Sequence, residues 1–64
     1  MAKPASVLVI DDDRTLVHLV TNALQQEDYA VLTAYDGQEG LRKMYESRPD
    51  LIILDINMPT MDGW

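Results

Sequence analysis

Acidic side chains follow two short apolar segments of the chain, and they are the residues best suited to chemistry. Asp11 and Asp12 come directly after Val7–Ile10, and Asp55 comes directly after Leu51–Leu54. Carboxylate oxygens are hard ligands, and neither histidine nor cysteine lies beside them, so they favour Mg²⁺, Mn²⁺ or Ca²⁺. A sparse carboxylate set leaves water on the ion, which suits Mg²⁺ working on phosphate.

Gathering three carboxylates at one point is costly unless a cation neutralises them or one stays protonated. Two carboxylates about 5 Å apart repel by roughly 3 kcal/mol at an effective dielectric constant near 20. A chain of 64 residues is expected to be stable by only ~3–10 kcal/mol. Acids after a strand also serve as helix caps, and we expect Asp13 to act as one. Two strands that both end in acid favour the metal-site interpretation over this structural alternative.

Five segments that alternate between strand and helix are expected to position these acids. Short apolar runs at 7–10, 29–34 and 51–54 are long enough for buried strands and too short for helices. Apolar residues recur at spacings of three and four over 14–27 and again between 36 and 49, which predicts two amphipathic helices.

The second predicted helix carries two local signals. Asp36 followed by Glu39 has the spacing of a capping box. Gly40, inside the helix, costs about 1 kcal/mol relative to alanine. We therefore expect either a close backbone contact at Gly40 or a weak helix.

The resulting β-α-β-α-β order predicts an α/β fold with an open parallel sheet. Each connection is long enough for a right-handed parallel crossover. In such a sheet, ligands bind at the carboxyl ends of the strands. Asp11, Asp12 and Asp55 should therefore meet at one edge if the first and third strands are neighbours.

The charge balance excludes several classes of partner. Five basic residues stand against eleven acidic ones, for a formal charge of −6. We expect no nucleic-acid binding, because phosphates demand a basic surface. We also expect no membrane association, because no apolar run approaches the ~20 residues of a span. The N-terminus does not resemble a signal peptide, so the expected location is cytoplasmic. His18 falls on the polar side of the first helix and is expected to be solvated.

Two motifs, residues 7–13 and residues 49–63, match a known family. Val7-Leu-Val-Ile-Asp-Asp-Asp13 precedes an amphipathic helix, and Pro49-Asp-Leu-Ile-Ile-Leu-Asp-Ile-Asn-Met-Pro-Thr-Met-Asp-Gly63 contains the third strand. Together they closely resemble the receiver domain of two-component response regulators. The resemblance covers nearly the whole chain. It implies the first half of a flavodoxin-like sheet, with strand order 2-1-3.

The resemblance also implies the roles of the acids. Asp55 would be the phospho-acceptor, taking a phosphoryl group from the histidine of a sensor kinase or phosphotransfer protein. Asp12 would hold Mg²⁺ directly, Asp11 through water, and Asn57 through its backbone carbonyl, with Asp55 completing the metal site. The module would accept phosphate in signalling and would not itself be an enzyme.

The sequence departs from the family pattern after the third strand. The serine or threonine of strand four and the lysine of strand five have no counterpart before Trp64. We therefore expect residues 1–64 to be a truncated receiver domain with no separate output domain. The alternative function is a self-associating structural half-module that binds Mg²⁺ weakly and is not phosphorylated. An aspartate-nucleophile phosphohydrolase is disfavoured, because its second acid would stand where this chain has Asn57.

An apolar third strand at the edge of the sheet predicts a homodimer. Leu51–Leu54 carries no charge, and a bare apolar edge pairs with another strand. Two copies would meet through their third strands or exchange elements. Sedimentation equilibrium at micromolar concentration should give a mass above that of the 7.3 kDa chain. A monomer with native-like helix content would contradict the prediction.

Overall fold

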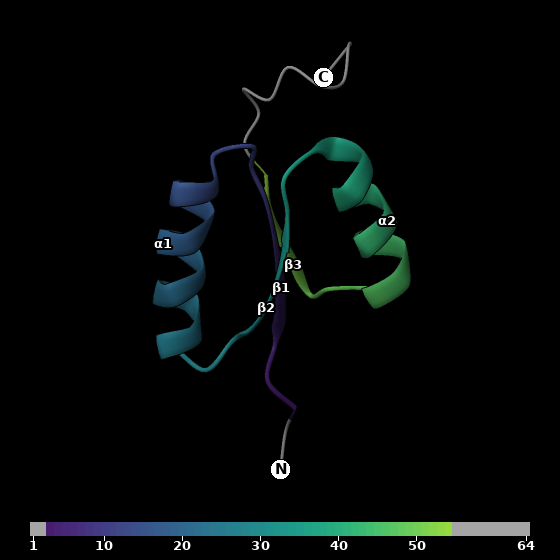
Figure 1. Cartoon of the computed structure of the whole chain (residues 1–64). Coiled ribbons are helices and arrows are strands. Elements are labelled where there is room, and N and C mark those ends of the chain that lie inside the picture. The colour runs from purple at the N-terminus through teal and green to yellow at the C-terminus, as the bar shows by residue number, and fades with distance from the viewer. Residues whose placement is uncertain (1–2, 55–64) are drawn as a thin grey trace.

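The computed structural model describes residues 3–54, which form three strands and two helices (Figure 1). The order is β-α-β-α-β, as the sequence predicts. The elements are β1 Ser6–Ile10, α1 Arg14–Gln26, β2 Ala30–Ala34, α2 Gly37–Ser47 and β3 Leu51–Leu54.

The strands form one parallel sheet in the order β2-β1-β3, which confirms the predicted topology. In the pairing of β1 with β3, Val7 lies opposite Leu51 and Ile10 lies opposite Leu54. Helices α1 and α2 lie on opposite faces of the sheet (Figure 1). The result is a three-layer α/β arrangement with β1 in the middle.

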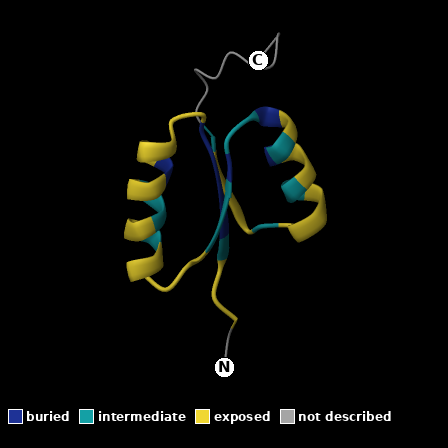
Figure 2. Ribbon diagram, viewed as in Figure 1, coloured by how far each residue is buried: buried dark blue, intermediate teal, exposed yellow. Residues whose placement is uncertain are grey.

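Strand β1 is buried on both faces because it lies between two strands and two helices (Figure 2). Val7 and Val9 pack with Val17 of α1 on one face. Leu8 and Ile10 pack on the other face, with side chains of β2, α2 and β3. This double burial explains why the strand is apolar at consecutive positions instead of alternating with polar residues.

The apolar side chains of β3 are more exposed to solvent than those of β1. Leu51 is 56% exposed, and Ile52 and Ile53 are each 37% exposed. In the described part of the chain, β3 pairs only with β1. The prediction of an apolar edge at this strand is therefore correct.

Element boundaries differ from the predicted ones by one residue in three places. Strand β1 begins at Ser6, which pairs with Ala30. Helix α1 ends at Gln26, one residue before the predicted end. Strand β2 begins after Tyr29, whose N–H donates to the carbonyl of Leu24 and so closes the end of α1.

Both helices begin with an aspartate cap. Asp13 accepts a hydrogen bond from the N–H of Leu16 at 3.2 Å, as predicted. Asp36 accepts one from the N–H of Glu39 at 2.8 Å. In a capping box the Glu39 carboxylate would accept a hydrogen bond from the N–H of Asp36. Here it accepts one from the N–H of Tyr35, at 2.9 Å.

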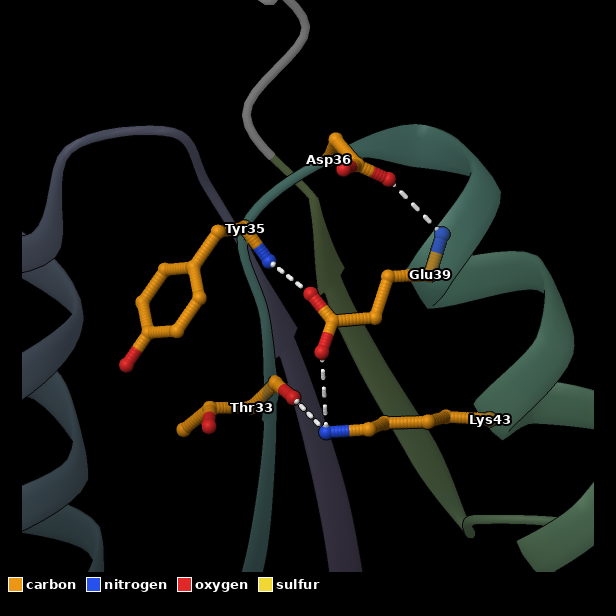
Figure 3. Close-up of polar contacts among 5 residues, drawn as sticks. All are labelled: Thr33, Tyr35, Asp36, Glu39 and Lys43. Carbon is orange, nitrogen blue, oxygen red and sulfur yellow. Dashed lines mark hydrogen bonds and ion pairs between the residues drawn. The ribbon is translucent and has the colours of Figure 1, made fainter.

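Glu39 fastens the start of α2 to the end of β2 (Figure 3). One carboxylate oxygen accepts the N–H of Tyr35, and the other lies 3.3 Å from Nζ of Lys43. Lys43 also donates to the backbone carbonyl of Thr33. The hydrogen bond from Tyr35, assisted by Lys43, lowers the pKa of Glu39 below its ordinary value.

Gly40 lies at a close contact between α2 and β1. A Cβ added at Gly40 would stand 2.5 Å from Cδ1 and 2.9 Å from Cγ1 of Ile10. Of the two expectations for this glycine, the close contact is therefore correct.

Gly40→Ala should destabilise the fold despite alanine's better helix propensity. Overpacking costs about 1–3 kcal/mol, against about 1 kcal/mol gained in propensity. Chemical denaturation should show the loss, and Ile10→Val should reduce it in the double variant by removing the atom nearest to the new methyl group. Equal losses in the two backgrounds would contradict this account.

Glu39→Gln should remove a pH-dependent part of the stability. The pKa of Glu39 is lower in the folded state than its ordinary 4.5, so the stabilisation is present above that value and is lost as pH falls through the folded-state pKa. Because hydrogen bonds to charged groups are stronger than neutral ones, the variant should lose about 1 kcal/mol at pH 7. Denaturation of both chains between pH 3 and pH 7 should show this difference shrinking as the pH falls.

The matched control is Glu46→Gln. Glu46 is an exposed carboxylate on the same helix, and its side chain has no hydrogen bond or ion pair among residues 3–54. If Glu46→Gln and Glu39→Gln change the pH profile equally, the network in Figure 3 is not the cause.

Candidate functional site

Asp11 is held at the carboxyl edge of the sheet, directly after β1. Its N–H donates to the carbonyl of Ala34 at 3.1 Å and so continues the pairing of β1 with β2 by one residue. Its side chain is buried, at 6% exposure. Oδ1 of Asp11 accepts the N–H of Asp13 at 3.0 Å. The backbone on both sides therefore fixes the position of this carboxylate.

Asp12 differs from its neighbour in being exposed. It lies in the connection between β1 and α1, which arches over the edge of the sheet (Figure 1). The next residue, Asp13, caps α1. The three consecutive acids thus have three different environments: one is buried, one is exposed, and one caps a helix.

The other two predicted site residues, Asp55 and Asn57, lie outside the described residues. The strand that precedes them ends at the same edge as β1, because Ile10 and Leu54 are paired. In the sequence, Asp11 follows Ile10 and Asp55 follows Leu54. The expectation that the first and third strands are neighbours is therefore confirmed.

Within residues 3–54, no group of three acids or histidines is close enough to hold a metal ion. Of the predicted ligands, the described residues include Asp11 and Asp12, which are consecutive in the connection after β1. His18 is exposed on α1, as predicted. Neither described helix is long and apolar enough to cross a membrane.

One contact at this edge was not predicted from the sequence. The guanidinium carbon of Arg14 lies 4.3 Å from the centroid of the Tyr35 ring, which is within the range of a cation–π interaction. The contact joins the first residue of α1 to the residue after β2. Its one sequence signal is an arginine at the start of a helix, where a positive charge is unfavourable.

The receiver domain family of response regulators matches residues 7–64 of this chain. The transcriptional regulatory protein PrrA of Mycobacterium tuberculosis is 49% identical over 57 residues, which are 89% of this chain and 24% of PrrA. The alkaline phosphatase synthesis regulator PhoP of Bacillus subtilis is 44% identical over the same length. A protein-glutamate methylesterase/protein-glutamine glutaminase of Maricaulis maris is 48% identical over 61 residues, 15% of its length.

A solved structure agrees with these sequence matches. The chemotaxis response regulator CheY4 of Vibrio cholerae has a TM-score of 0.88 and 44% identity, over 92% of this chain and 49% of that chain. The chain thus spans about a quarter of PrrA and about half of CheY4. The parallel 2-1-3 sheet and the sequence match agree with each other, and this chain belongs to the response regulator receiver domain family.

Proposed function

We propose that this receiver domain accepts a phosphoryl group on Asp55 from the phosphohistidine of a sensor kinase or phosphotransfer protein. The observation that carries the proposal is the parallel pairing of β1 with β3, with Ile10 opposite Leu54. Asp11 and Asp55 each follow a member of that pair in the sequence. Membership of the receiver family supports the same assignment.

The reaction requires little from the protein beyond positioning and charge. A carboxylate oxygen of Asp55 attacks phosphorus, the P–N bond to the donor imidazole breaks, and its electron pair stays on that nitrogen. The product is an acyl phosphate. A carboxylate is an established nucleophile for such an intermediate.

The acids of the connection after β1 fit a magnesium ion. Both offer hard oxygen ligands, and Asp12 is exposed whereas Asp11 is buried and anchored. We propose that Asp12 binds the ion directly and Asp11 through water, with Asp55 and the backbone carbonyl of Asn57. When bound, Mg²⁺ offsets the negative charge of the carboxylates and of the phosphoryl oxygens.

The chain itself is proposed to be a phospho-acceptor and not an enzyme. Among its relatives, PrrA and PhoP are named as regulators, whereas the Maricaulis maris protein is named as a methylesterase/glutaminase. The latter match covers only 15% of that protein. The regulatory names support a signalling role, which we propose takes place in the cytoplasm.

The second candidate function is the self-associating half-module. The exposed apolar side chains of β3, from Leu51 to Ile53, favour it. Two copies would pair through β3 or exchange elements, and Mg²⁺ would bind weakly without phosphorylation. The sedimentation experiment described for the third strand tests the association, and the phosphodonor experiment below separates the two functions.

Incubation with acetyl phosphate and Mg²⁺ should add one phosphoryl group to the chain, detected by intact mass. Asp55→Ala should abolish the adduct because the nucleophile is lost. The control is Asp28→Asn, which removes a distant exposed carboxylate at a left-handed position that asparagine tolerates. No adduct on the parent chain, or one that persists in Asp55→Ala, would refute the assignment.

Mg²⁺ should raise the melting temperature of the chain, and Asp12→Asn should remove most of that gain. A ligand that binds only the folded state at 100 times its dissociation constant adds about 2.7 kcal/mol of stability. Asp13→Asn is the matched control, because it removes a charge from the same connection while asparagine still caps α1. If Asp12→Asn binds Mg²⁺ as well as the parent does, Asp12 is not a ligand.

A further inference from the structure

Arg14 is the one basic residue that begins a helix at the acidic edge of the described chain. It follows Asp11–Asp13 directly and is the first residue of α1. Lys43 is also near this end, but its Nζ is bound by Glu39 and by the carbonyl of Thr33. The remaining basic residues within 3–54 lie before β1, along α2 or after α2: Lys3, Arg42 and Arg48.

The helix dipole of α1 does not favour an arginine at this position. The start of a helix carries a partial positive charge, so a cation there is unfavourable. The first turn of α1 contains no acidic residue, and the acid that precedes Arg14, Asp13, accepts a hydrogen bond from the N–H of Leu16. A residue that works against the stability of its own helix is a sign of a functional position.

Beyond its contact with Tyr35, Arg14 forms no ion pair within residues 3–54. The guanidinium carbon lies over the ring, 4.3 Å from its centroid. The N–H donors of a guanidinium lie in its plane and match phosphate oxygens in pairs. Arg14 is exposed, and the one ion pair within residues 3–54 is that of Lys43 with Glu39.

A phosphodonor that approaches this edge meets like charge. The phosphoryl group carries about two negative charges near neutral pH, and the sequence puts acids after both β1 and β3. A cation at the rim lowers the resulting repulsion. We propose that Arg14, oriented by Tyr35, is a donor-recognition residue that binds the oxygens of the incoming phosphoryl group.

This assignment rests on the proposed function, but it can be tested without phosphoryl transfer. In the Asp55→Asn chain, which lacks the nucleophile, acetyl phosphate should bind without reacting. Addition of acetyl phosphate at constant ionic strength should shift the Nε–H resonance of Arg14 and leave that of Arg42 unchanged. Equal shifts, or none at Arg14, would overturn the proposal.

A second test measures the phosphorylation rate and the Mg²⁺ affinity of variants of Arg14. The two quantities should change in opposite directions. Loss of the positive charge of Arg14 should slow phosphorylation severalfold, because the phosphoryl group then meets the acids of this edge without a compensating cation. Arg14→Gln should show this loss, Arg14→Lys should fall between it and the parent, and Arg42→Gln should stay within about twofold of the parent. Removal of the same charge should tighten Mg²⁺ binding to Arg14→Gln, whereas general damage to the site would weaken it.

Tyr35→Leu tests the orienting contact. The variant keeps an apolar side chain beside Val17 and leaves the charge of Arg14 in place. Its phosphorylation rate should therefore fall toward that of Arg14→Gln, whereas its Mg²⁺ affinity should stay at the parent value. An unchanged rate would exclude a role for Tyr35, and an Arg14→Gln rate equal to that of Arg42→Gln would exclude Arg14. If the parent forms no adduct, the proposed function fails, and the resonance titration still decides the role of Arg14.

Discussion

The parallel pairing of β1 with a strand on each side is the constraint on which the rest of this molecule depends. It buries Val7–Ile10 of β1, because neighbouring strands cover the edges of β1 and the two helices cover its faces. It also fixes where the chain can carry polar groups. Asp11 is the first position after β1, and even there the backbone N–H still pairs with Ala34. The acids at this edge of the sheet therefore directly follow the buried residues of β1.

The two helices are attached to this sheet by different interactions. Helix α1 contributes Val17 to one face of β1, and its start is joined to the end of β2 by the Arg14–Tyr35 contact. Helix α2 approaches the other face so closely at Gly40 that an added Cβ would clash with the side chain of Ile10. Its start is fastened to β2 through Glu39. In both cases the polar contacts hold the helix start, which is the end that lies beside the site.

The acids at this edge divide their roles according to their surroundings. Asp13 stabilises α1 as a cap, and the anchored carboxylate of Asp11 also accepts a hydrogen bond that shapes the same connection. Asp12 is exposed and makes no such contact within the described chain. An acidic connection of this kind has a structural function even in the absence of a ligand. Three consecutive aspartates are therefore not equivalent, and the capping role expected of Asp13 is the one that the structure shows.

The sequence by itself determined the element order, the parallel sheet and the acids that end two strands. These follow from local signals: apolar runs too short for helices, helical spacing between them, and aspartates at strand ends. It also anticipated both caps, and it offered a close contact as one of two explanations for Gly40. The resemblance to receiver domains supplied the strand order, which the structure confirms.

Only the tertiary structure decided which partners the side chains of Glu39 and Arg14 meet at the end of β2. Glu39 binds the N–H of Tyr35 instead of closing the capping box, because the end of β2 offers that donor at 2.9 Å. Arg14 meets Tyr35 for the same reason, since the folding of α1 against β2 brings them together. Such pairs leave no periodic trace in a sequence. Their partners are set by the packing of whole elements, and that packing is a property of the complete sheet.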